Sequence, residues 1–106
     1  MAYYAVRVTL AQANTNYKLV DLVRALRPGS AVPDMARQLS MQADAGNTQP
    51  VLVGDENLSA TDYGLSLSSG SPPFSYITEG ANVPLGGIWV RSAAANQSLL
   101  VSILEA

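Results

Sequence analysis

The sequence predicts an all-β domain, an antiparallel β-sandwich of the jelly-roll type with about seven or eight strands and one short helix. Short stretches that alternate apolar and polar residues recur at intervals of about ten residues. Gly, Pro, Asn and Ser separate these stretches, as in chains that fold back repeatedly into antiparallel strands. Helices do not alternate with the strands, which argues against a parallel α/β sheet. At 106 residues the chain, 1–106, is expected to form a single domain.

The first strand and the only helix are predicted in the N-terminal third. Residues 3–10 alternate as a strand with one buried face does. Asn16 is the expected N-cap of a helix over 17–26, whose apolar residues recur at helical spacing. Pro28 and Gly29 are expected to end this helix. The buried face of the strand should carry Tyr4, Val6, Val8 and Leu10.

The remainder of the chain is predicted to consist of strands joined by polar turns. Pro72 and Pro73 favour an edge position for the strand that follows them. Gly86 and Gly87 are expected to give a flexible entrance or a bulge in the strand they begin. The last strand is the most apolar, so a central position or a buried interface is expected for it. These strands are 37–43, 51–53, 63–68, 74–78, 85–91 and 98–104.

Composition excludes several functional classes. The chain has no Cys and no His, so disulfides, thiolate chemistry and the commonest general base are absent. The net charge is −2 and the cations are scattered, so nucleic-acid binding is not expected. No apolar run has the length of a membrane span. Charged residues make up 13% of the chain, against about 25% in typical soluble domains. A surface so poor in charge suits a subunit of an assembly.

The acids and hydroxyls of the sequence form no recognisable catalytic or metal-binding motif. Asp55, Glu56 and Asp62 superficially resemble a calcium loop, but the ligand spacing and the closing Glu of an EF-hand are missing. A Ser-Lys dyad would need Lys18, which is expected to be solvated. A cupin-type enzyme would lack its histidine ligands. We therefore expect no enzymatic activity, no catalytic or metal-binding residues and no cofactor.

The aromatic residues are the candidate anchors for protein contacts. We expect Tyr3, Tyr4, Phe74 and Tyr76 to meet partners, together with the loops at 56–62 and 71–84. A carbohydrate- or host-receptor-binding module is the alternative, with two or more aromatic rings side by side in a groove near Asp or Asn. The aromatic residues available for that alternative are Tyr63, Phe74, Tyr76 and Trp89.

Three blocks of the chain resemble small virion proteins of tailed bacteriophages. They read NTNYKLVDLVRAL, RQLSMQADAGNTQPVLVGDENLSATDYGLSLSSG and LGGIWVRSAAANQSLLVSILEA. The shared features are a VGD passage followed by Ser and by Tyr-Gly, an Ile-Trp-Val-Arg strand, a turn of Ala, Asn and Gln, and a terminal apolar strand. These motifs are structural, and the resemblance carries over no catalytic residue.

The resemblance implies a non-enzymatic structural role in a phage particle. A capsid decoration or cement subunit is the first expectation, and a tail or neck component is an alternative. The implied partners are other copies of the chain, in a homo-oligomer such as a trimer, and the major capsid protein or another virion protein. Neither nucleic acid nor a membrane is an expected partner. The implied location is the virion, assembled in the cytoplasm of the bacterial host.

Overall fold

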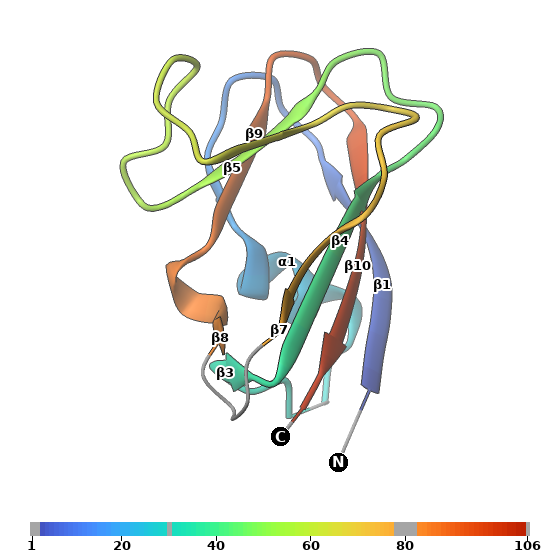
Figure 1. Ribbon diagram of the computed structural model, residues 1–106, viewed down its shortest axis with the longest axis vertical. Helices are drawn as coiled ribbons and strands as arrows, with labels where there is room; N and C mark the ends of the chain where they lie inside the picture. The colour runs from blue at the N-terminus through green and yellow to red at the C-terminus, as the bar shows by residue number, and fades with distance from the viewer. Residues whose placement is uncertain (1–2, 30, 78–82, 106) are drawn as a thin grey trace.

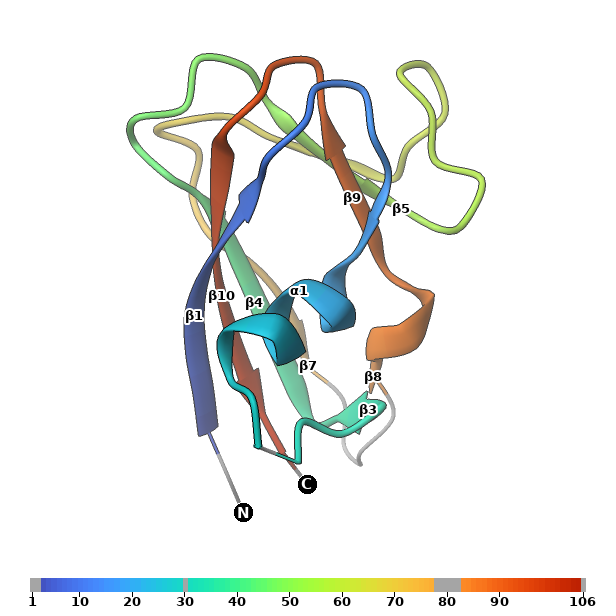
Figure 2. The same ribbon diagram turned by 180° about the vertical axis from the view of Figure 1, so that it is seen from behind.

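Two four-stranded antiparallel sheets form the body of the computed structural model, which describes residues 3–29, 31–77 and 83–105 (Figure 1). The helix α1 (Leu19–Leu26) packs beside the first strand, on the side of the molecule that Figure 2 shows. A single 3₁₀ turn, η1 (Leu85–Gly87), precedes the ninth strand. The strands are β1 (Tyr3–Leu10), β2 (Tyr17–Lys18), β3 (Met35–Ala36), β4 (Gln38–Ala43), β5 (Val51–Gly54), β6 (Leu65–Leu67), β7 (Phe74–Ile77), β8 (Val83–Pro84), β9 (Trp89–Ser92) and β10 (Gln97–Leu104).

The strand order is that of a jelly roll. One sheet, called sheet A, has the order β1-β10-β4-β7, and the other, called sheet B, has the order β2-β9-β5-β6. Among these eight strands only β5 and β6 are neighbours both in the chain and in a sheet, and all other connections cross between the two sheets, as in the double Greek key of jelly-roll domains. The predicted all-β antiparallel sandwich with one short α-helix is therefore confirmed. A two-stranded ribbon of β3 and β8 is added to it.

The core lies between the two sheets. Alternate residues of each strand point inward, so the apolar residues of the alternating stretches meet there. Strand β10 lies between β1 and β4, as its apolar sequence predicts, and pairs with β1 from Tyr3↔Leu104 to Leu10↔Gln97. Among the largest fully buried side chains are Leu10, Leu19, Leu39, Met41, Leu85, Leu99 and Ile103. Burying a side chain of this size contributes about 1.5–3 kcal/mol to folding.

The predicted start of the helix is wrong. The helix begins at Leu19, because residues 17 and 18 form β2 and pair with β9. The Leu19 N–H donates to the Ile88 carbonyl oxygen at 3.0 Å. This backbone N–H at the start of the helix therefore has a hydrogen-bond partner without an N-cap side chain. Lys18 occupies the N-cap position without a side-chain hydrogen bond. Asn16 instead donates from Nδ2 to the Leu58 carbonyl oxygen at 2.8 Å.

The stretch 85–91, predicted as one strand, is divided. Its first three residues form η1, and β9 begins only at Trp89. Leu85 is fully buried and its N–H donates to the Asp34 carbonyl oxygen at 2.9 Å, which turns the chain inward before the strand starts. The glycine pair therefore serves a helical turn and not a bulge. The edge position predicted for residues 74–78 is correct for Phe74–Ile77, whereas residues 78–82 lie outside the described residues.

Two polar side chains, the buried Gln97 and the half-buried Asn47, hold the turn at 44–50 against β10. Gln97 is 5% exposed, and its Oε1 accepts from the N–H groups of Thr48 at 2.7 Å and Gln49 at 3.1 Å. Its Nε2 donates to the Ala95 carbonyl oxygen at 3.0 Å. The Asn47 amide makes two bonds to the β10 backbone, at 2.7 and 2.8 Å. Every polar atom of the Gln97 amide group thus has a partner, as burial requires.

Candidate protein-interaction surface

The two N-terminal tyrosines predicted as contact residues lie on opposite faces of sheet A. Tyr3 is on the outer face, away from sheet B, and 65% of it is exposed. Tyr4 is on the inner face, where its ring packs against the core. The Tyr4 hydroxyl donates to the Ala31 carbonyl oxygen at 3.3 Å. Because neighbouring residues of a strand alternate in direction, only Tyr3 is presented to a partner that docks on the outer face.

The other two predicted contact residues form a pair on the edge strand β7. Phe74 pairs with Met41 and Tyr76 pairs with Leu39, so both rings share the inner face of sheet A. The rings stack with centroids 4.7 Å apart and planes 29° from parallel. Strands β1 and β7 are the two opposite edges of this sheet. The four predicted residues therefore do not form one contact patch.

The register of sheet A places its outward side chains in rows that run across the strands. One row consists only of small residues, and the rows on either side of it carry larger ones. The small row is Ala5, Ser102, Ser40 and Ser75. The row on one side is Tyr3, Leu104, Gln38 and Ile77, and the row on the other is Arg7, Leu100 and Gln42.

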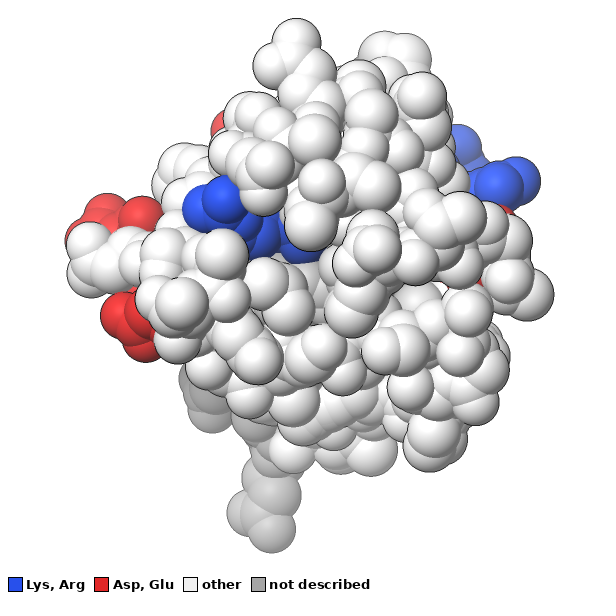
Figure 3. All heavy atoms as spheres, turned by 90° about the horizontal axis from the view of Figure 1, so that it is seen from above, with Lys and Arg blue, Asp and Glu red and all other residues white. Residues whose placement is uncertain are grey.

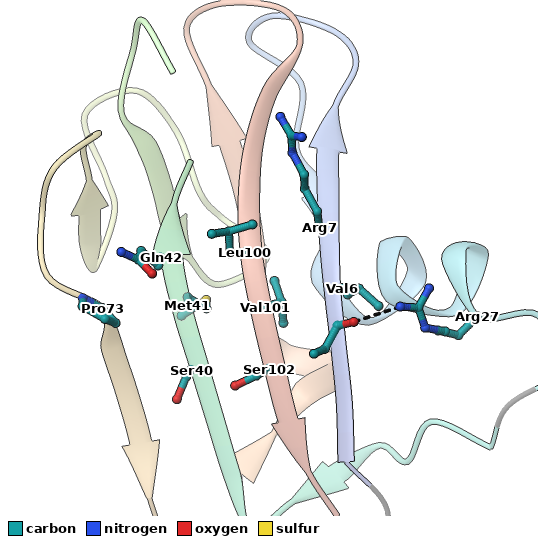
Figure 4. A pocket seen from close by; sticks show the side chains of 11 residues that line it. Val6, Arg7, Arg27, Ser40, Met41, Gln42, Pro73, Leu100, Val101 and Ser102 are labelled. Carbon is teal, nitrogen blue, oxygen red and sulfur yellow. Dashed lines mark hydrogen bonds between the residues drawn. The ribbon is translucent and has the colours of Figure 1, made fainter. Parts of the chain in front are cut away.

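The small row is the floor of a shallow groove across the outer face, called the sheet A groove. The part of the groove between Ala5, Ser102 and Ser40 on its floor and Arg7, Leu100 and Gln42 beside them has a volume of about 370 Å³, and Pro73 closes it beside Gln42. Figure 4 shows Ser40 and Ser102 at one level of the sheet and Gln42, Leu100 and Arg7 at the next. The hydroxyls of Ser40 and Ser75 lie 2.8 Å apart and hydrogen-bond to each other. The floor is therefore polar but uncharged, and a partner can cover it without desolvating a charge.

Charge is confined to the β1 end of the sheet A groove. Arg7 forms an ion pair with Asp44 at 3.2 Å. Arg27 reaches from the end of α1 and donates from Nη2 to the Ala5 carbonyl oxygen at 2.9 Å, the dashed line in Figure 4. Within the described residues Arg27 has no carboxylate partner. Its bond to the backbone protects the free edge of β1 from pairing with another strand.

Large apolar side chains are exposed around the same groove. Ile77 is 70% exposed, Tyr3 is 65% exposed and Leu100 is 38% exposed. All three lie on the outer face of sheet A. Seen from above the strands, most of the visible surface is uncharged, and its charged atoms lie in small separate groups (Figure 3). An uncharged floor with apolar side chains on its walls is the composition of a protein contact surface.

Sequence patterns did not reveal the sheet A groove. Its floor combines residues from four strands, and only the pairing of those strands brings them into one row. Each of these residues by itself occupies an ordinary outward position of an alternating strand. Ile77 and Leu100 could have indicated an exposed contact surface from the sequence, because both are large apolar residues at positions of the alternation that are otherwise polar.

Among the described residues, no group of three or more His, Cys, Asp or Glu side chains could hold a metal ion. Within the same residues, the hydrogen bond and the charge of Arg24 lower the pKa of the Asp34 carboxyl group. This pair lies beside α1 and does not line the sheet A groove. The described part of the chain has no helix long and apolar enough to cross a bilayer.

Tyr63 and Trp89, two rings of the predicted carbohydrate groove, line two separate depressions. Tyr63 lies beside Asp55 and Asp62, and Trp89 lies beside Asp55 and Glu56. Asp55 thus borders both depressions, at the loop that follows β5. The comparisons with known protein families, with curated proteins and with solved structures find no match to this chain.

Proposed function

We propose that this protein is a non-enzymatic structural subunit of a tailed-bacteriophage particle. In this role it forms a homo-oligomer and docks on the major capsid protein or another virion protein, as a decoration or cement subunit does. The observation that carries the proposal is the outer face of sheet A, which combines an uncharged floor with exposed apolar walls. The jelly-roll topology supports it, because viral capsid domains use this architecture.

The fold alone does not select this function, since lectins and cupins share the jelly roll. The outer face of sheet A makes the difference, because the large apolar side chains of Tyr3, Ile77 and Leu100 are exposed on it beside the uncharged groove floor. Such a surface gains free energy by excluding water over a large area rather than by holding one small molecule. The virion resemblance of the segments around β5, β6, β9 and β10 agrees with this role.

The test introduces a positive charge into the floor of the sheet A groove. Ser102 is half-buried on the central strand β10, and a lysine at this position places an ammonium group where a partner would exclude water. Burying an unpaired charge costs several kcal/mol, so Ser102→Lys should weaken association by at least about tenfold. Oligomeric state is measured by light scattering, and docking is measured by co-sedimentation with particles that lack the protein.

The matched control is Ser66→Lys on the outer face of sheet B. Ser66 is exposed on β6 and does not border the sheet A groove, so the same change in charge should leave association unaltered. Gln42→Lys, at an exposed position of β4 that lines the groove, provides a second variant should Ser102→Lys fold poorly. Equal association of the groove variants and the control would exclude this surface. A wild-type protein that stays monomeric and binds no virion component would overturn the proposed function.

Particles separated into heads and tails distinguish the two locations. Co-sedimentation with heads supports a decoration or cement subunit. Co-sedimentation with tails or necks supports a tail or neck component that uses the same sheet A groove.

A further inference from the structure

A second depression lies on sheet B, at the end where β5 leaves the sheet and β9 enters it. The register pairs Gly54 with Trp89, so the residues after β5 run beside the residues before β9. Asp55 and Glu56 form one side of the depression and Gly86 and Gly87 form the other. Its volume is about 340 Å³, within the range of about 300–1,000 Å³ typical of small-ligand sites. It is called the Trp89 depression below.

Trp89 supplies the aromatic surface of the depression. Its paired neighbour on β5 is Gly54, which has no side chain to cover the indole. Trp89 lies on the outer face of sheet B, half-buried, between Lys18 of β2 and Gly54 of β5. A Cβ atom added at Gly87 would meet nothing within 4 Å, so there is room for a side chain at this position. The absence of side chains at positions 86 and 87 leaves one side of the depression open to a ligand.

Side-chain packing and a hydrogen bond hold the loop after β5 in place beside the indole. Leu58 is only 3% exposed, although it is not part of the main core between the sheets. It packs over Gly54, where an added Cβ atom would lie 3.0 Å from Leu58 Cδ1. Asp55 Oδ1 accepts from the Asn57 N–H at 2.9 Å, which orders the start of the loop. The backbone that carries Asp55 and Glu56 is therefore held in place relative to Trp89.

The polar groups around the indole include both acceptors and a donor. Glu56 and the second carboxylate oxygen of Asp55 have no protein partner among the described residues. Lys18 lies next to Gly86 but outside the lining of the depression; its Cε would be 3.8 Å from a Cβ atom at Gly86. A ligand in the depression therefore meets carboxylate oxygens in the lining, with a lysine side chain near its border.

The two carboxylates and the indole restrict the chemical class of the ligand. A phosphate or carboxylate ligand would be repelled by Asp55 and Glu56. A cationic ligand would be attracted by both carboxylates and opposed only by the neighbouring Lys18, so a cation such as choline is the competing ligand in the test below. A purely apolar ligand would desolvate both carboxylates without replacing their hydrogen bonds. A neutral sugar ring has C–H groups that stack on an aromatic face, and hydroxyls that both donate and accept hydrogen bonds.

We propose that the Trp89 depression binds a neutral saccharide unit, with its C–H face against the indole and its hydroxyls bonded to Asp55 and Glu56. The site lies on sheet B and is separate from the sheet A groove, so it is independent of the proposed structural role. A subunit that docks through sheet A would present this site on the opposite sheet of the sandwich.

The test uses the intrinsic fluorescence of Trp89, the only tryptophan in the chain. The full-length protein is titrated with glucose, galactose and N-acetylglucosamine to high millimolar concentration, and with soluble dextran and galactan as polymeric sources. At least one of these sugars is expected to produce a saturable change in emission. Monosaccharide binding identifies a site for a single unit, and binding of the polymer alone identifies a site for a chain; either supports the proposal.

Two variants of the same loop separate the site from a non-specific effect. Glu56→Ala removes a carboxylate that lines the Trp89 depression, and Asp62→Ala removes one that does not. Hydrogen bonds to charged groups contribute about 1.5–3 kcal/mol, so Glu56→Ala should weaken binding about tenfold or more, while Asp62→Ala should match the wild type. Both residues are exposed, so circular dichroism should show the same fold for both variants.

Three outcomes would overturn the saccharide proposal. They are no saturable change with any of the sugars, equal weakening by the two variants, and stronger binding of choline or phosphate than of any sugar. None of these outcomes affects the proposed structural role, whose test depends on Ser102 and on association.

Discussion

Replacing Gln97 with leucine removes the buried amide that fixes the turn at 44–50 to β10. Leucine keeps approximately the same volume but leaves the N–H groups of Thr48 and Gln49 and the carbonyl of Ala95 without their present partner. Three hydrogen bonds at a net value of about 0.5–1.5 kcal/mol each correspond to a loss of about 1.5–4.5 kcal/mol. The greater apolarity of leucine and access of water to the exposed residues 48 and 49 offset part of this loss. We expect Gln97→Leu to lower the free energy of unfolding by about 2 kcal/mol.

Urea denaturation followed by Trp89 emission measures this change, because Trp89 lies in sheet B, away from the substituted turn. For a domain of this size the same loss corresponds to a decrease of about 8–16 °C in the melting temperature. The control is Gln42→Leu at an exposed position of β4, which should change stability by no more than about 0.5 kcal/mol. Equal stabilities of the two variants would refute the argument that the buried amide holds the turn.

Three further predictions concern the loops and one ion pair. Leu58→Ala should reduce the free energy of unfolding by about 2–3 kcal/mol in urea, and a loss below about 0.5 kcal/mol would show that this side chain does not hold the loop on sheet B. Gly70→Ala should cost about 1 kcal/mol because residue 70 has a φ of +84°, whereas Gly87→Ala, with free space and no positive φ, should be nearly neutral. Arg24 lowers the pKa of Asp34 below its ordinary value of 3.8, so the pair stabilises the fold above that value and the contribution is lost as the pH falls through the folded-state pKa. The urea midpoint of Asp34→Asn should accordingly lie below that of the wild type at neutral pH and converge with it in acid; a difference that persists at low pH would contradict the assignment.

The sheets could be predicted from the sequence because a strand with one buried face alternates with a period of two residues. That pattern located β1 and β10, and the strong apolarity of the last strand placed it centrally. Strands of two residues, such as β2 and β3, contain too few positions to show any alternation. The predicted helix start was wrong because Asn16 was taken as the N-cap. An asparagine amide that can cap a helix can equally donate to a loop carbonyl, and Asn16 donates to that of Leu58.

The candidate surfaces were less accessible to sequence reasoning than the fold. The alternation correctly placed Tyr4 on the inward face of its strand, which conflicted with its prediction as a contact residue. The faces of Phe74 and Tyr76 follow from the register of β7 against β4. The floor of the sheet A groove depends on the relative register of four strands, and Ala5 and Ser102 are separated by most of the chain. The Trp89 depression likewise forms where β5 and β9 pair, so neither segment alone contains it.

The pairing of β1 with β10 also sets the order of events during folding. The strand at Tyr3–Leu10 has β10 as its sole partner in sheet A, and β4 is bound to β10 on the other side. Sheet A therefore cannot assemble while the chain is being synthesised, until residues 97–104 have left the ribosome. Contacts between segments so distant in sequence make folding slow and expose apolar strands in the meantime. The yield of soluble protein should therefore depend on synthesis rate and temperature, and an incomplete chain that ends before residue 97 should aggregate.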